Sequence, residues 1–97
     1  MSNTQTENAL AQAIEAEIRS LAIRIEMVTA SVQQNAADIL ASANAFKRDV
    51  DNGWHRKDQA GFLSTHVRAY EYNATELESL KHQQRVLMHI INTTEGE

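Results

Sequence analysis

Four histidines are the residues best suited to metal or proton chemistry in this sequence. They are His55, His66, His82 and His89. On a helix, His82 and His89 would share one face, with Glu78 one turn before His82. A metal site needs three or four converging ligands, and the sequence has neither His-Glu-x-x-His nor paired Glu-x-x-His motifs. We therefore expect no metal and no cofactor, and we expect the histidines to be solvated or packed.

Nucleophilic and carboxylate catalysis also lack a suitable arrangement. The serines are scattered along helical patterns, with no Gly-x-Ser-x-Gly elbow. Glu17 is the only carboxylate on the apolar face of the first helical pattern, whereas paired-carboxylate chemistry needs two. No glycine-rich loop could hold a phosphate. The sequence predicts a protein that is not an enzyme.

Basic and aromatic residues gather around Trp54, where Lys47, Arg48 and Arg56 could contact an anionic partner. Three acidic residues interleave with them and cancel much of the positive charge: Asp49, Asp51 and Asp58. The net charge of −4 argues against a nucleic-acid partner. A nucleic-acid-binding helical protein, which would show steep salt dependence, is therefore the last of the alternative functions. Trp54 is either a lid on the ends of the helices or, with Arg56, an exposed protein contact.

The elements that position these residues are two long amphipathic helices. Apolar residues recur at steps of three or four along the first: Leu10, Ile14, Ile18, Leu21, Ile25, Val28, Val32, Ala36, Ile39, Ala43, Phe46 and Val50. The mean step is close to 3.6 residues, which predicts a fairly straight helix from about residue 5 to 51. Thr4-x-x-Glu7 has the form of a capping box at its start. Asn52-Gly53 suits a left-handed cap at its end.

The second helix is predicted from about residue 57 to 92. Its inner face is Phe62, Leu63, His66, Tyr70, Asn73, Leu77, Leu80, Gln84, Leu87, Met88 and Ile91. Because the turn between the helices is short, they should be antiparallel neighbours in one domain over residues 1–97, with 1–4 and 93–97 frayed. The chain has no proline, three glycines and no cysteine, so an all-α hairpin without disulfides is expected.

A lone hairpin would leave apolar surface in contact with water. Val86, Leu87, Ile90 and Ile91 cover too much of the second helix for one partner helix to bury. We expect a homodimer that forms a four-helix bundle, with these four residues as the association surface. A kink within residues 33–35 would instead give a monomeric three-helix bundle. Asn73 and Gln84 sit on the apolar face and are candidates to set register or oligomeric state.

The region after the turn resembles the WXG-type secreted helical hairpins, in Trp54, in Phe62 and in the Tyr-x-Tyr-Asn-Ala-Thr-Glu-Leu stretch of residues 70–77. The resemblance implies a leaderless secreted hairpin. Arg56 stands where that family has glycine, and its export signal has no match near residues 93–97.

The leading hypothesis is a protein–protein interaction module. It would be an adaptor, inhibitor, chaperone or assembly subunit, of the kind that phages and secretion systems often encode. Its partners would be itself and an unidentified protein. The polar N-terminus and the absence of a long apolar run predict no membrane insertion and a cytoplasmic location, with leaderless secretion left open.

Overall fold

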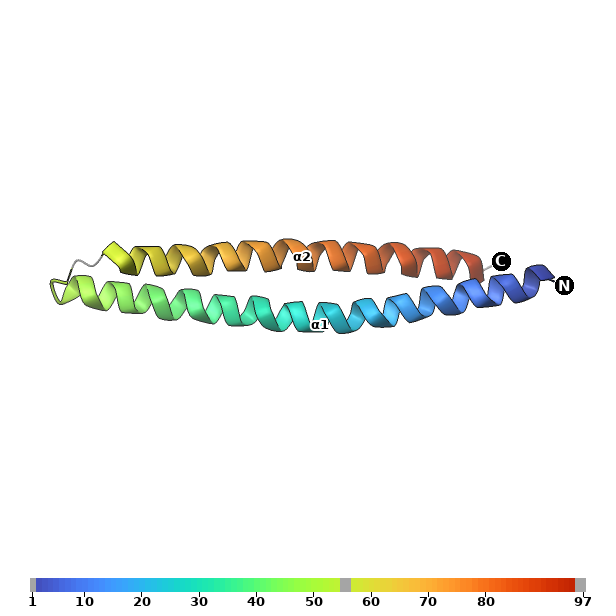
Figure 1. The fold of residues 1–97 in the computed structure, drawn as a ribbon, viewed down its shortest axis with the longest axis horizontal. Helices are drawn as coiled ribbons and strands as arrows, with labels where there is room; N and C mark the ends of the chain where they lie inside the picture. Colours follow the sequence, from blue (N-terminus) through green and yellow to red (C-terminus); the bar gives the residue numbers. More distant parts are fainter. Residues whose placement is uncertain (1, 55–56, 96–97) are drawn as a thin grey trace. The chain divides into compact units, whose positions relative to one another are not determined.

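The protein is described by a computed structural model that covers the backbone of residues 2–54 and 57–95, and the side chains of 6–54, 58 and 60–93. Helix α1 spans Ser2–Asp51 and helix α2 spans Lys57–Glu95 (Figure 1). No strand occurs among these described residues. The all-α hairpin predicted from the sequence is confirmed.

Contacts divide the chain into two units. The terminal unit combines Met1–Met27 with Leu77–Glu97, and the turn unit is Val28–Glu76. In the terminal unit the first half of α1 packs beside the second half of α2. In the turn unit the two remaining halves pack as an antiparallel pair around the connection (Figure 1).

Three details of the helices differ from the sequence prediction. Helix α1 is uninterrupted from Ser2 to Asp51, so it does not fold back within residues 33–35, and the three-helix bundle is wrong. Because α1 begins at Ser2, Thr4 lies inside its first turn and not before its first residue, where the predicted capping box would place it. Helix α2 continues to Glu95, past the predicted end at 92, and the Thr93 hydroxyl donates to the His89 carbonyl at 2.8 Å.

The end of α1 is closed by the cap that Asn52-Gly53 predicted. Gly53 has φ of 84°, the left-handed conformation that glycine adopts without a Cβ penalty. Its N–H donates to the Val50 carbonyl at 3.0 Å, and the Trp54 N–H donates to the Asp49 carbonyl at 2.7 Å. This pair of bonds is the Schellman arrangement, which satisfies carbonyls that the helix end leaves open.

Replacing Gly53 or Gly61 with alanine should change the free energy of unfolding in opposite directions. Nothing lies within 4 Å of a Cβ added at either Gly53 or Gly61, so only the backbone decides. Gly53→Ala should destabilise by about 1 kcal/mol, because an L residue is strained at this positive φ. Gly61→Ala should stabilise by about 0.5–1 kcal/mol, because Gly61 lies inside α2. Urea unfolding midpoints measure both, and shifts of the same sign would contradict this account.

Among the buried and half-buried side chains of each helix, those that follow one another at steps of three, four or seven residues form a line, here called the seam. On α1 the seam is Ile14, Ile18, Leu21, Ile25, Val28, Val32, Asn35, Ile39, Ser42 and Asp49. On α2 it is Leu63, His66, Asn73, Leu77, Leu80, Gln84, Leu87 and Ile91. The steps alternate between three and four or span one whole repeat, so the seam follows the seven-residue repeat of a coiled coil.

The seam therefore departs from the 3.6-residue stripe after Val32. The stripe continues through Ala36 and Val50, but the structure leaves these two residues exposed. Their neighbours are covered in their place: Asn35 is half-buried and Asp49 is buried. Two long helices stay in contact only along a 3.5-residue repeat, and a 3.6-residue stripe drifts away from that line. The stripe or inner-face residues that the structure leaves exposed are Leu10, Ala36, Phe46, Val50, Phe62, Tyr70 and Met88.

Because the apolar stripe leaves the seam after Val32, the terminal unit and the turn unit differ in how many apolar side chains they bury. Among the described residues, the buried apolar side chains are Leu21, Leu80 and Ile91, and all three belong to the terminal unit. In the turn unit the seam carries polar side chains: Asn35, Ser42, Asp49, His66 and Asn73. Because apolar burial is the main stabilising contribution, the terminal unit holds most of the core.

Candidate interaction surfaces

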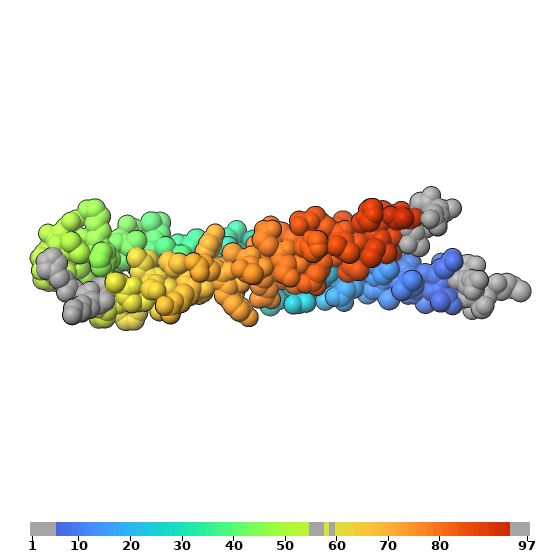
Figure 2. Space-filling view, turned by 90° about the horizontal axis from the view of Figure 1, so that it is seen from above, coloured from blue at the N-terminus to red at the C-terminus, as the bar shows by residue number. Residues whose placement is uncertain are grey.

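A groove of about 300 Å³ opens on the surface of the terminal unit. It is lined by Glu17 and Leu21 from α1 and by His82, Gln83, Val86 and Leu87 from α2. Figure 2 shows the two contributing helix segments, blue and orange-red, packed against each other. The sequence singled out Glu17 and His82 separately, and the structure brings them to one groove because the helices are antiparallel there. Val86 and Leu87 are the association residues that line it.

The four predicted association residues have different surroundings. Val86 is 43% exposed and Ile90 is 42% exposed, so both are accessible to another molecule. Leu87 is half-buried on the seam and also lines the groove. Ile91 is 7% exposed, so it belongs to the core of this chain. The accessible part of the predicted surface is therefore the edge formed by Val86 and Ile90.

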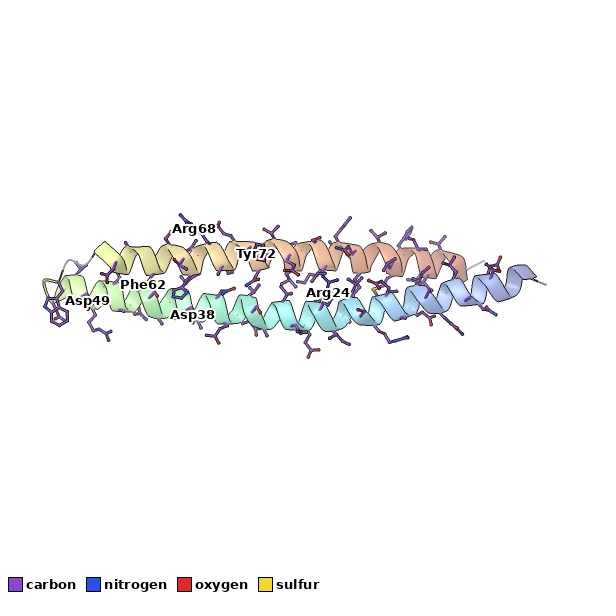
Figure 3. All side chains as sticks on the ribbon, in the orientation of Figure 1. Arg24, Asp38, Asp49, Phe62, Arg68 and Tyr72 are labelled. Atoms are coloured by element: carbon purple, nitrogen blue, oxygen red, sulfur yellow. The ribbon has the colours of Figure 1, made fainter. Side chains whose placement is uncertain are left out.

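The side chain of Trp54 is 60% exposed, so it is not a lid over the last turn of α1. Other aromatic and apolar side chains near the turn are exposed as well: Phe46, Val50 and Phe62. Phe62 lies on the first turns of α2, and Asp49 on the last turn of α1 (Figure 3). Arg56, the second predicted contact at the turn, lies outside the described residues together with His55.

Charge near the turn is partly neutralised within α1. The Lys47 ammonium contacts the Asp51 carboxylate at 2.6 Å, one helical turn away, and both side chains are exposed. Such surface pairs contribute at most about 1 kcal/mol to stability. The pairing nevertheless reduces the positive field that a phosphate backbone would need, which weighs against a nucleic-acid surface here.

The clearest polar contact between the helices joins two asparagines in the turn unit. The Asn73 side-chain amide donates to the Asn35 side-chain oxygen at 2.7 Å, and the pair is partly buried. Asn73 was predicted to set register, and its partner Asn35 was not identified. Gln84 also lies on the seam, half-buried, in the terminal unit. A paired amide on an apolar seam favours one register, because sliding the helices would leave it unpaired.

Replacing one asparagine of the pair should lower the free energy of unfolding more than replacing both. Asn35→Ala leaves the Asn73 amide partly buried without its partner, and should destabilise by about 1–2 kcal/mol. Asn35→Leu with Asn73→Leu should be at least as stable as the wild type, because the seam becomes apolar there. Chemical unfolding of the single and double variants tests this. A double variant less stable than Asn35→Ala would contradict it.

The remaining polar candidates are the histidines and Glu17. No three histidine, aspartate or glutamate side chains there are grouped as ligands for a metal ion. His66 is half-buried on the seam, whereas His82 and His89 are exposed. The groove contains one carboxylate, Glu17, and no second one. The groove is lined by three apolar and three polar side chains: Leu21, Val86 and Leu87, and Glu17, His82 and Gln83.

Within the described residues, neither α1 nor α2 contains a segment with the length and apolarity needed to cross a lipid bilayer. Comparison of the chain with protein-family models, curated proteins and solved structures finds no match.

Proposed function

We propose that this protein is a non-enzymatic protein–protein interaction module that self-associates through the terminal unit and presents its turn to another protein. The observation that carries this proposal is the exposure of Val86 and Ile90 beside an apolar groove. Large apolar side chains with a neighbouring groove are typical of a surface that another protein covers.

The small core supports self-association. Only three large apolar side chains are buried among the described residues, in a chain of 97 residues. Small domains bury a low fraction of their surface and often gain stability by oligomerisation. A homodimer with four packed helices would add a second layer of contacts to the terminal unit. The Val86 and Ile90 side chains would then leave water.

The turn is the proposed surface for a different protein. Trp54 and Phe62 are each more than half exposed, and tryptophan is the residue most enriched among binding hot spots. Arg56 is proposed as the polar part of the same contact. In this role the hairpin would act as an adaptor, inhibitor, chaperone or assembly subunit, of a phage- or secretion-associated kind. The cytoplasm is the proposed compartment.

Light scattering over a dilution series tests self-association directly. The expected mass is twice that of the 10.9 kDa chain at high concentration, falling towards one chain on dilution. A constant mass of one chain at every concentration would refute self-association.

Affinity capture from the native host tests the turn. Trp54→Ala should lose a captured protein that the wild type retains. Leu40→Ala is the matched control, because Leu40 is 62% exposed on α1 and lies outside the turn. If both variants retain the same captured proteins as the wild type, the turn is not the partner surface.

A leaderless secreted hairpin of the WXG type is the second candidate. The observation that favours it is the hairpin itself, with Gly53 and Trp54 directly after α1. A secretion cluster encoded beside the gene, and the protein in the culture medium of intact cells, would distinguish this candidate from the cytoplasmic module.

A further inference from the structure

Two rows of side chains lie on one face of the terminal unit. On α1, Ala13, Glu17 and Ser20 follow at helical steps of four and three. On α2, Gln83, Val86 and Ile90 follow at steps of three and four. Glu17, Gln83 and Val86 all line the same groove. The two rows therefore flank the groove from opposite helices.

The two rows differ in size. The α1 row has small side chains, Ala13 and Ser20, about one helical turn on either side of Glu17, and both are exposed. The α2 row has two branched apolar side chains, Val86 and Ile90, which are both about half covered. Helices pack well when large side chains of one enter spaces between side chains of the other. The α1 row of one copy stacked on the α2 row of another would satisfy this condition. Two α1 rows, or two α2 rows, stacked on each other would not.

The charges of the two helix segments also differ. Up to Met27, α1 carries four glutamates and two arginines, a net charge of −2: Glu7, Glu15, Glu17, Glu26, Arg19 and Arg24. From Leu77 to its end at Glu95, α2 carries two glutamates and two basic residues, which cancel to a net charge of zero: Glu78, Glu95, Lys81 and Arg85. Like charges oppose α1 beside a copy of α1, whereas α2, with no net charge over this segment, does not repel α1.

We propose that a second copy of this chain covers the groove, with its α2 stacked on the α1 of the first copy. By symmetry, Val86 and Ile90 of each copy enter the spaces around Glu17 of the other, so two equivalent contacts form about a two-fold axis. Each helix of the terminal unit then has antiparallel neighbours, as in an up-and-down four-helix bundle. The arrangement rests on the self-association proposed above and adds which helix meets which.

Disulfide cross-linking can distinguish the possible arrangements, because the chain has no cysteine of its own. Ser20→Cys and Val86→Cys are made as separate proteins, one with a larger tag, then unfolded together, refolded and mildly oxidised. A disulfide forms only when the two Cα atoms are within about 7 Å. The α1-on-α2 arrangement predicts a mixed disulfide of the combined mass, at least about tenfold more abundant than either variant linked to itself.

Ile23→Cys mixed with Val86→Cys is the matched control. Ile23 is 60% exposed and lies three residues from Ser20, yet it is not among the residues that line the groove. This mixture should give no disulfide above background. Circular dichroism and light scattering on the reduced proteins establish that each variant remains helical and associated.

The outcomes separate the two proposals. A mixed Ser20–Val86 disulfide supports the α1-on-α2 arrangement. Val86→Cys that links to itself as readily, in a protein that light scattering shows to be a dimer, overturns the arrangement and leaves self-association intact. A mass of one chain for the wild type and all variants overturns both.

Discussion

Replacing Val86 and Ile90 with glutamate is expected to dissociate the dimer into single hairpins. Both side chains are more than 40% exposed in the hairpin, so the substitutions cost the isolated chain little. In the dimer each new carboxylate would lie beside Glu17 of the other copy, so two negative charges would repel each other at close range. Burying an unpaired charge costs several kcal/mol, so the dissociation constant should rise by about 100-fold or more.

The expected readout is a mass of one chain by light scattering at concentrations where the wild type is dimeric. Helicity by circular dichroism should remain close to that of the wild type. Ile23→Glu with Leu40→Glu is the control, because it adds the same charge at side chains that are 60% and 62% exposed. The control should remain a dimer. If Val86→Glu with Ile90→Glu keeps the wild-type mass, the terminal unit does not self-associate through this face.

Leu80→Ala is expected to destabilise the hairpin more than any other single truncation on α2. Leu80 is 2% exposed and lies on the seam of the terminal unit, whose α1 side is anchored by Leu21 at 1% exposed. Truncating a fully buried leucine costs about 2–5 kcal/mol, through lost apolar burial and the cavity that remains. The free energy of unfolding of a small protein is only about 5–15 kcal/mol, so Leu80→Ala should remove a large part of it.

Thermal unfolding measured by circular dichroism at fixed protein concentration checks this prediction. The concentration is held fixed because association with a second copy also stabilises the folded chain. Leu40→Ala is the matched control, since it makes the same chemical change at a 62% exposed site and should shift stability by only about 0.5 kcal/mol. Equal shifts for the two variants would mean that the terminal unit does not hold the core.

Much of the fold follows from local properties of the sequence. The absence of proline and the long apolar periodicity predicted two helices, and the structure confirms them. Asn52-Gly53 predicted the end of α1 because only glycine adopts a positive φ there without strain. These features depend on a few neighbouring residues, so the sequence is sufficient to read them.

The line of contact between the helices was decided by tertiary packing. The 3.6-residue stripe indicated Ala36 and Val50, whereas a helix that follows its neighbour over many turns buries side chains at 3.5-residue spacing. Beyond Val32 the two spacings separate, and Asn35 takes the place on the seam. The Asn35–Asn73 hydrogen bond could not be found from the sequence, because it joins residues 38 positions apart.

Which apolar side chains of α2 are exposed was likewise decided by tertiary packing. Periodicity grouped Val86 and Ile90 with Leu87 and Ile91, and only the register of α2 against α1 separated the exposed pair from the buried Ile91. The groove with Glu17 and His82 exists because the antiparallel pairing sets one helix beside the other at those positions. The sequence determined that two amphipathic helices form and where the turn lies. Packing between the helices determined which apolar side chains remained for another molecule, since burial depends on the partner surface and not on the residue type alone.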